Sequence, residues 1–332
     1  MEGYELTMNL QAKEEKKGIY KKYSVDDVRK FPFVYLIIAL PVIQIAIFFF
    51  YVKFSALAMS FQDEYGNWSL VSFERVFKAF KTGSDHLSYN PWQMIGNSLQ
   101  IWVIQHVIGF AVSILTSYIL TRHMIGSKFF RLVFYVQAIV GAVVFSSIMK
   151  EMYMRGGVIF TLLKDLGVEL PAQALKNGLL GADETAFTTL SWQIFAFTIA
   201  GGNMIVASAY MKIPNEIFES CELEGCGFFR ETFQVAVPCV WPTLSTIIIF
   251  SLCSILTADY SMYLYSDGSG KKGMVSVGFY FYRQQVAMST ATDPRYLYGY
   301  ASAFGMLMTI ITIPIVLITK KVLAKLQENV EF

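Results

Sequence analysis

Hydrophobic residues occur in six long blocks separated by more polar stretches. The blocks cover about residues 31–54, 95–120, 129–149, 186–210, 240–265 and 298–319. Each block is close to the roughly 20 apolar residues that a helix needs to cross the hydrocarbon core of a bilayer. Backbone groups in lipid must be satisfied within the segment, and the alternating pattern of barrel strands is absent. The pattern predicts an all-α polytopic membrane bundle with about six transmembrane helices.

The polar segments give the expected domains and orientation. Residues 1–30 form a lysine-rich tail, residues 31–320 the six-span domain and residues 321–332 a second tail. Lys and Arg near span ends favour the cytoplasmic side, and they gather in both tails and in the link after the second block. We therefore expect a multi-pass protein of the cytoplasmic membrane with both termini inside. Three outer segments follow, at about 55–94, 150–185 and 266–297.

Composition and motifs exclude several classes of function. Only 16% of the residues are charged, against about a quarter in soluble domains. No basic stripe with interleaved aromatic residues suggests a nucleic-acid partner. The four cysteines lack zinc-site spacing, so we expect no metal and interpret them as small, partly buried residues. No phosphate loop, H-E-x-x-H or G-x-S-x-G motif occurs, so we expect no catalytic residues and no bound cofactor.

The segment 211–238, between the fourth and fifth blocks, is polar enough to leave the membrane. Pro214 suits the first position of a helix, and the carboxylate of Glu219 suits its first turns. Gly225 is a natural stop, because glycine adopts the left-handed conformation at low cost. A second short helix, ending before Pro238, is expected to carry two aromatic residues on one face, Phe229 and Phe233. These signals alone predict a cytoplasmic helical hairpin.

The spacing in this segment resembles the EAA motif of the membrane subunits of binding-protein-dependent ABC importers. That motif has isoleucine-proline, then Glu-Ala-Ala, three residues, glycine, and a later phenylalanine and proline. The matching positions are Ile213, Pro214, Glu219, Ser220, Cys221, Glu224, Gly225, Cys226, Phe233 and Pro238. Three small residues stand for alanines of the motif, and Glu224 stands for an aspartate. The resemblance implies a cytoplasmic coupling helix that ends near Gly225, with Glu219 placed to hold an N–H or an arginine.

The resemblance extends over most of the chain and points to the carbohydrate branch of the family, the maltose and multiple-sugar "F" type. The strings that carry it outside the coupling segment are residues 60–63 after the first block, 97–98 in the second, 130–131 in the third and 299–303 in the last. Gln137 stands where relatives often have proline. The third span is therefore expected to be straighter than theirs.

The resemblance implies a subunit that imports a sugar or oligosaccharide in a complex. Its implied partners are a second homologous permease, two cytoplasmic ATPase subunits that bind ATP and Mg, an extracellular sugar-binding protein and membrane lipid. The alternative is a secondary transporter or another self-contained polytopic protein. Such carriers usually show inverted repeats and broken helices at mid-membrane, and this sequence shows neither clearly.

Polar residues inside the blocks are candidates for the cargo path. Buried polar groups in membrane helices usually face the bundle interior or a water path. Aromatic faces with amide or carboxylate groups suit sugars, so the candidates are Gln193, Asp259 and Tyr260. The competing interpretation is hydrogen bonding between packed helices, and for Asp259 a place at the outer interface.

Overall fold

The computed structural model describes residues 32–122, 126–140, 142–256, 265, 274–291 and 294–328. These residues confirm the all-α prediction: about 81% of the chain is helical, and no strand occurs in the described part. The β pairing recorded there is an isolated bridge between Gln62 and Trp68. Contacts divide the chain into two units, Met1–Ala58 and Met59–Phe332, which are described separately.

The first unit holds α3 (Pro32–Ile45), η1 (Ala46–Tyr51) and most of α4 (Val52–Ser60). The backbone stays helical through the π-helical turn η1, which has no buried residue. The large apolar side chains of this whole helical run, from Tyr35 onward, are exposed. A helix that is apolar on every side and unburied by protein is suited to lipid.

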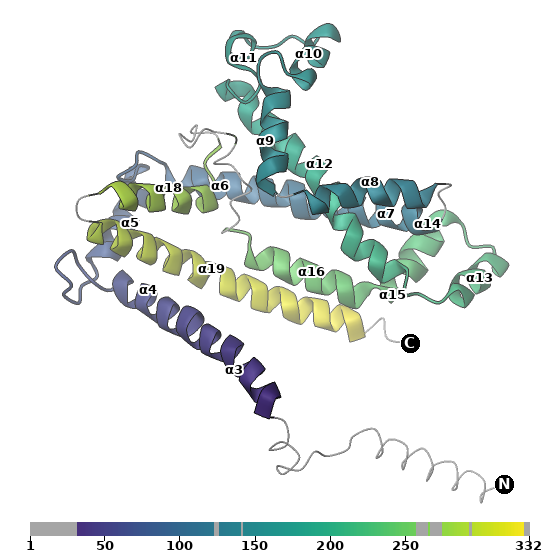
Figure 1. Ribbon diagram of the computed structural model, residues 1–332, viewed down its shortest axis with the longest axis horizontal. Helices are drawn as coiled ribbons and strands as arrows, with labels where there is room; N and C mark the ends of the chain where they lie inside the picture. Colours follow the sequence, from purple (N-terminus) through teal and green to yellow (C-terminus); the bar gives the residue numbers. More distant parts are fainter. Residues whose placement is uncertain are drawn as a thin grey trace, which may run out of the picture. The chain divides into compact units, whose positions relative to one another are not determined.

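The second unit begins with α5 (Val71–Thr82) and a long helical run made of α6 (Pro91–Trp102), η2 (Val103–Gly109) and α7 (Phe110–Arg122). The next helices are α8 (Ser127–Ile139), α9 (Ala142–Tyr153), α10 (Val158–Asp165), α11 (Ala172–Asn177) and α12 (Asp183–Tyr210). The rest are α13 (Asn215–Leu223), α14 (Phe228–Arg230), η3 (Glu231–Ala236), α15 (Val237–Cys239), α16 (Trp241–Cys253), α18 (Val277–Thr290) and α19 (Arg295–Glu328). Helix α12 packs along η2 and α7, and α19 lies beside α5 and α16 (Figure 1).

Four helices are long and apolar enough to cross a membrane, within the described residues. They are Tyr35–Ser60, Pro91–Arg122, Asp183–Tyr210 and Arg295–Leu326, which match the first, second, fourth and sixth predicted blocks. The pair Phe228–Cys239 and Trp241–Cys253 passes the same test together but is bent by 73°. It contains the start of the fifth block, whose later part includes residues outside the described ones. The described helices thus supply four or five spans, and a count of six stays a prediction.

The third block is divided between two helices. Helix α8 ends at Ile139, Val140 is extended with φ −72° and ψ 123°, and α9 starts at Ala142. The sequence at the break is Ile-Val-Gly, and β-branched residues and glycine all have weak helix propensity. The break shows that a helix can be interrupted without proline where its local propensity is low, and the comparison with the relatives' span that Gln137 suggested stays a prediction.

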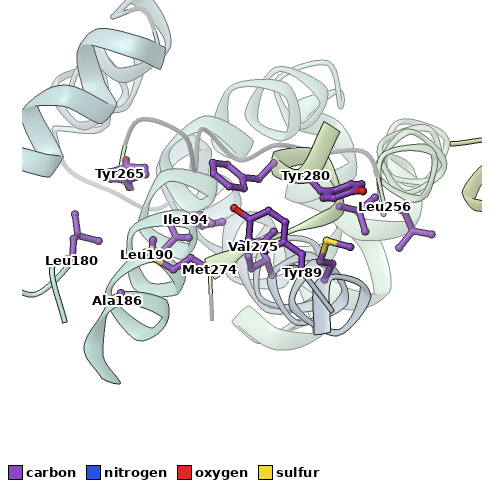
Figure 2. Packing of buried hydrophobic residues seen from close by; sticks show 14 of the residues in the cluster. Tyr89, Leu180, Ala186, Leu190, Ile194, Leu256, Tyr265, Met274, Val275 and Tyr280 are labelled. Atoms are coloured by element: carbon purple, nitrogen blue, oxygen red, sulfur yellow. The ribbon is translucent and has the colours of Figure 1, made fainter. Parts of the chain in front are cut away.

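A cluster of buried apolar side chains joins several elements of the second unit, and Figure 2 shows part of it. Two polar side chains of α6 fix α18 to this cluster. The Asn97 side-chain amide donates to the carbonyl of Val275 (3.0 Å), and the Ser98 hydroxyl accepts from the N–H of Val277 (2.9 Å). All four residues are buried. The Asn-Ser string noted in the sequence therefore ties two helices that lie far apart in the chain.

Local contacts also explain two other strings noted in the sequence, residues 60–63 and 299–303. The Asp63 carboxylate accepts from the N–H groups of Asn67 (2.8 Å) and Tyr65 (2.9 Å), which shapes the turn after α4. These hydrogen bonds hold the pKa of Asp63 below its usual value. At Gly299 a Cβ would lie 2.7 Å from the Ser72 hydroxyl, so a small residue lets α19 approach α5.

Candidate functional site

Helix α13 is the element that the predicted coupling segment forms. Pro214 has φ −57° and ψ 141° and stands at the N-cap, so the helix starts one residue later than predicted, at Asn215. Its extended ψ explains the shift, since a helical residue needs a negative ψ. The Pro214 carbonyl accepts from the N–H of Ile217 (3.3 Å). The helix therefore begins with a rigid, proline-fixed corner.

The C-terminal end of α13 confirms the predicted glycine stop. Gly225 has φ +71°. Its N–H donates to the carbonyl of Glu222, and the N–H of Cys226 donates to the carbonyl of Cys221, both at 3.0 Å. This pair of bonds is the Schellman arrangement, which satisfies carbonyl groups at a helix end. Glycine is favoured at this position because the backbone is left-handed there.

The second helix of the segment is longer than predicted. It runs from Phe228 to Cys239 through η3 and α15, so the expectation that it ends before Pro238 was wrong. Pro238 lies two residues after the end of the π-helical turn η3, where the irregular hydrogen bonding makes its missing N–H less costly than in a regular helix. Phe229 and Phe233 are both exposed, 71% and 52%, in line with one outward face.

The two sides of α13 differ sharply in burial. Phe218 is 1% exposed and Cys221 5%. The outward side holds exposed residues, namely Glu216, Glu219, Ser220, Leu223 and Glu224. Among the described residues no ion pair reaches Glu219. The expected N–H or arginine partner of Glu219 stays a prediction, and an arginine lies beside Glu222 and Glu231.

The arginine beside Glu222 and Glu231 is Arg122, the last residue of α7. Its guanidinium lies 3.8 Å from the centre of the Phe218 ring, and its Nη1 donates to the Asn215 side-chain oxygen at 3.3 Å. Its nitrogens lie 3.9 Å from Glu222 and 3.8 Å from the buried Glu231. The sequence marked Arg122 only as a cytoplasmic positive charge. A basic residue at a span end, facing an acidic short helix, was the signal that could have identified it.

A small aromatic cluster lies under α13. The Tyr118 ring packs near the rings of Phe218 (6.5 Å), Phe228 (5.7 Å) and Tyr210 (5.5 Å). The same buried cluster contains Val206, Ala236, Val240 and Leu244, with Ile213 packed against it. Helices α7, α12, η3 and α16 therefore meet at the inward side of α13.

The cysteines differ in burial more than was expected. Cys221 is buried and Cys226 partly buried, but Cys239 and Cys253 are exposed. The last two sit on outward helix faces that protein does not cover, so the interpretation as partly buried residues was wrong for them. A hydrogen bond with the Cys226 thiol, together with burial, raises the pKa of Cys221 to about 11. Because the thiolate is the reactive form, Cys221 is a packing residue rather than a nucleophile.

Of the three predicted cargo-path residues, only one lies in the described part of the chain. Gln193 on α12 is 5% exposed, and its side-chain oxygen accepts from the Tyr153 hydroxyl at 2.9 Å. This contact joins α9 to α12. Asp259 and Tyr260 lie outside the described residues, so their place in the cargo path stays a prediction.

Comparison with known proteins places these features in context. No protein-family model matches the chain. The probable ABC transporter permease YurN of Bacillus subtilis is 24% identical, over 76% of this chain and 85% of its own length. The multiple sugar-binding transport system permease MsmF of Streptococcus mutans is 24% identical, over 82% and 88%. The diacetylchitobiose uptake system permease NgcF of Streptomyces coelicolor is 21% identical, over 58% and 52%.

Two solved structures of a bacterial ABC transporter that imports alginate share the fold. One matches with a TM-score of 0.71 at 18% identity, covering 90% of this chain and 98% of that chain. The other contains a periplasmic protein bound to an alginate pentasaccharide, and it matches with a TM-score of 0.73 at 18% identity over 91% and 97%. The predicted resemblance is thus confirmed: the relatives include sugar ABC transporter permeases, and the fold is that of an ABC importer permease. The apolar helices and these relatives together indicate a membrane-embedded protein.

Proposed function

We propose that this chain is the permease subunit of an ABC importer that moves a sugar or oligosaccharide across the cytoplasmic membrane. An extracellular binding protein delivers the cargo, and partner ATPase subunits with bound ATP and Mg supply the energy. A second homologous permease completes the path. The chain itself has no enzymatic role in this scheme, and its termini lie in the cytoplasm.

The observation that carries the proposal is the two-sided burial of α13. Its inward side is anchored by Phe218 and Arg122, and its outward side is an exposed ridge that contains Glu219. The positions of the EAA resemblance fall on α13, on the residues that cap it at either end, or on the helix that follows it. A short helix that is fixed to the bundle and open on its other side is suited to fit a groove on a partner.

Movement of such a helix would couple ATP hydrolysis to transport. Closure of the two ATPase subunits shifts the groove that holds α13, and α13 shifts the spans between inward-open and outward-open arrangements. Coupling of this kind needs two global states that a distant ligand favours unequally. The exposed positions Glu219, Ser220 and Glu224 are proposed to contact the ATPase, together with Phe233 on the next helix.

The cargo class rests on the relatives. MsmF and NgcF are named for sugar uptake, and the structural neighbours belong to an alginate importer. Gln193, Asp259 and Tyr260 stay candidates for the cargo path. For Gln193, the buried bond to Tyr153 supports a role in holding α9 to α12 in this conformation.

The test is substrate-stimulated ATP hydrolysis by the complex in liposomes. The complex is co-expressed with the ATPase and second permease from neighbouring genes. The binding protein is loaded with the sugar that a panel of defined mono- and oligosaccharides identifies. We expect Glu219→Lys with Gly225→Trp to abolish stimulation and uptake while the spans still insert. Lys325→Glu, a charge change at an exposed residue of α19 outside the motif, serves as the control.

Two outcomes would refute the proposal. One is normal stimulation and uptake by the Glu219→Lys, Gly225→Trp double variant. The other is uptake by the purified chain without any ATPase subunit, which would favour the self-contained transporter.

A further inference from the structure

The contacts of Arg122 span the whole length of α13. Its guanidinium approaches Asn215 in the first turn, Phe218 in the middle and Glu222 in the last turn. It also approaches Glu231 on η3. Among the described residues, the one ion pair that joins α13 to another helix is this contact between Arg122 and Glu222. One side chain of α7 therefore touches α13 at three points and the following helix at a fourth.

The chemistry of these contacts requires an arginine. A planar guanidinium stacks on an aromatic face and directs several N–H donors to oxygen atoms, whereas an ammonium is a compact, strongly hydrated charge. The Glu231 side chain is 5% exposed, and a buried carboxylate is stable only with a partner. Arg122 supplies a positive charge 3.8 Å from Glu231, in addition to the hydrogen bond between Glu231 and Tyr118, so the same residue contacts α13 and helps to stabilise the buried carboxylate.

The path from Arg122 into the membrane is direct. Arg122 ends the helical run that starts at Pro91, and α7 packs along α12. Both are among the helices long enough to span. A displacement of α13 that reaches Arg122 is thus applied to the end of one span and passes by side-chain packing to a second.

We propose that Arg122 is a positioning residue that fastens α13 to α7 and transmits the movement of α13 to the spans α7 and α12. The inference rests on the proposed function, because it takes α13 as the element that the ATPase moves. Arg122 touches neither cargo nor nucleotide in this scheme. Its role is to keep the distance between α13 and α7 fixed while both move.

The experiment compares three variants, Arg122→Lys, Arg122→Gln and Arg122→Gln with Glu231→Gln. The double variant removes the buried carboxylate that Arg122→Gln alone would leave without its cation. Arg131→Gln is the matched control, since Arg131 is a cation of α8 whose recorded bonds are to Ser127 and Met211 rather than to α13. All are measured in the assembled complex with the ligand-loaded binding protein.

The direct readout is a spin-label distance between α7 and α13. Labels go on Ile119→Cys and Ile217→Cys, which replace exposed residues, in a chain whose native cysteines are changed to alanine. The distance is recorded without nucleotide and with Mg-ATP plus vanadate. In the chain that keeps Arg122, we expect one narrow distribution of the label distance in both states. In the double variant, we expect a broad distribution. We expect stimulation of ATP hydrolysis to fall at least tenfold in the double variant and about threefold in Arg122→Lys.

A narrow distance and full stimulation in the double variant would overturn the inference. If that variant does not insert, Arg122→Lys decides, because it keeps a cation beside Glu231, and wild-type stimulation in it would equally overturn the inference. Failure of the proposed function looks different. If the proposed function fails, the Glu219→Lys, Gly225→Trp double variant keeps normal stimulation of ATP hydrolysis. If only this inference fails, that variant still loses stimulation while the Arg122 variants keep it.

Discussion

Replacing Gly225 with alanine tests whether the C-terminal end of α13 needs its left-handed residue. At φ +71° an alanine is strained. A Cβ built on Gly225 would meet no atom within 4 Å. The whole cost of Gly225→Ala is therefore the backbone conformation, without a steric clash.

The size of that cost follows from the conformation. A non-glycine residue in the left-handed region costs about 1–2 kcal/mol, and asparagine costs less because its side chain bonds locally. A change of this size raises the population of the opened last turn by about 5–30-fold. The opened turn loses the bond from Cys226 to Cys221 and the bond from Gly225 to Glu222.

The assay is hydrogen exchange of the backbone amides of residues 220–230 in the assembled complex, read together with stimulated ATP hydrolysis. We expect protection and coupling to fall in the order glycine, Gly225→Asn, Gly225→Ala. Gly227→Ala is the matched control. It lies two residues later, has φ −78° and also has open space at its Cβ.

Two results would refute this reasoning. One is exchange in Gly225→Ala as slow as in the unmodified chain. The other is an equal loss of protection in Gly227→Ala, which would show that any side chain in this turn is harmful and that the left-handed backbone is not the cause.

Two further substitutions test the packing. Phe218→Ala removes a side chain that is 1% exposed and lies under the Arg122 guanidinium, so we expect a loss of about 3–5 kcal/mol, seen as a lower thermal midpoint of the purified protein. Ile217→Ala, at 39% exposure on the same helix, should cost much less, and equal losses would contradict the orientation of α13. Ser98→Ala leaves the buried N–H of Val277 without its acceptor, so we expect about 1–3 kcal/mol. An unchanged midpoint would show that α18 does not depend on this bond.

The positions of most spans could be predicted because membrane helices have a fixed length requirement. The second, fourth and sixth blocks correspond to Pro91–Arg122, Asp183–Tyr210 and Arg295–Leu326. The end of α13 was also predictable, since a glycine stop depends on one residue and its immediate neighbours. Both features are local in the chain.

The misses arose where neighbouring turns or distant contacts decide the outcome. Hydropathy is averaged over a block, so it did not reveal the extended backbone at Val140 between α8 and α9. The helix through Pro238 depends on the π-helical turn that precedes it. Gln193 was selected for its chemistry, but its bond to Tyr153 depends on how α9 meets α12.

The sequence by itself determined that the chain is a membrane-type helix bundle, where most of its spans lie, and where the coupling segment stops. These follow from runs of apolar residues and from the conformational freedom of glycine, which need no tertiary context. Only the tertiary structure decided which side of α13 is anchored. Arg122 and Phe218 are 96 positions apart in the sequence, and their stacking exists only because α7 ends beside α13.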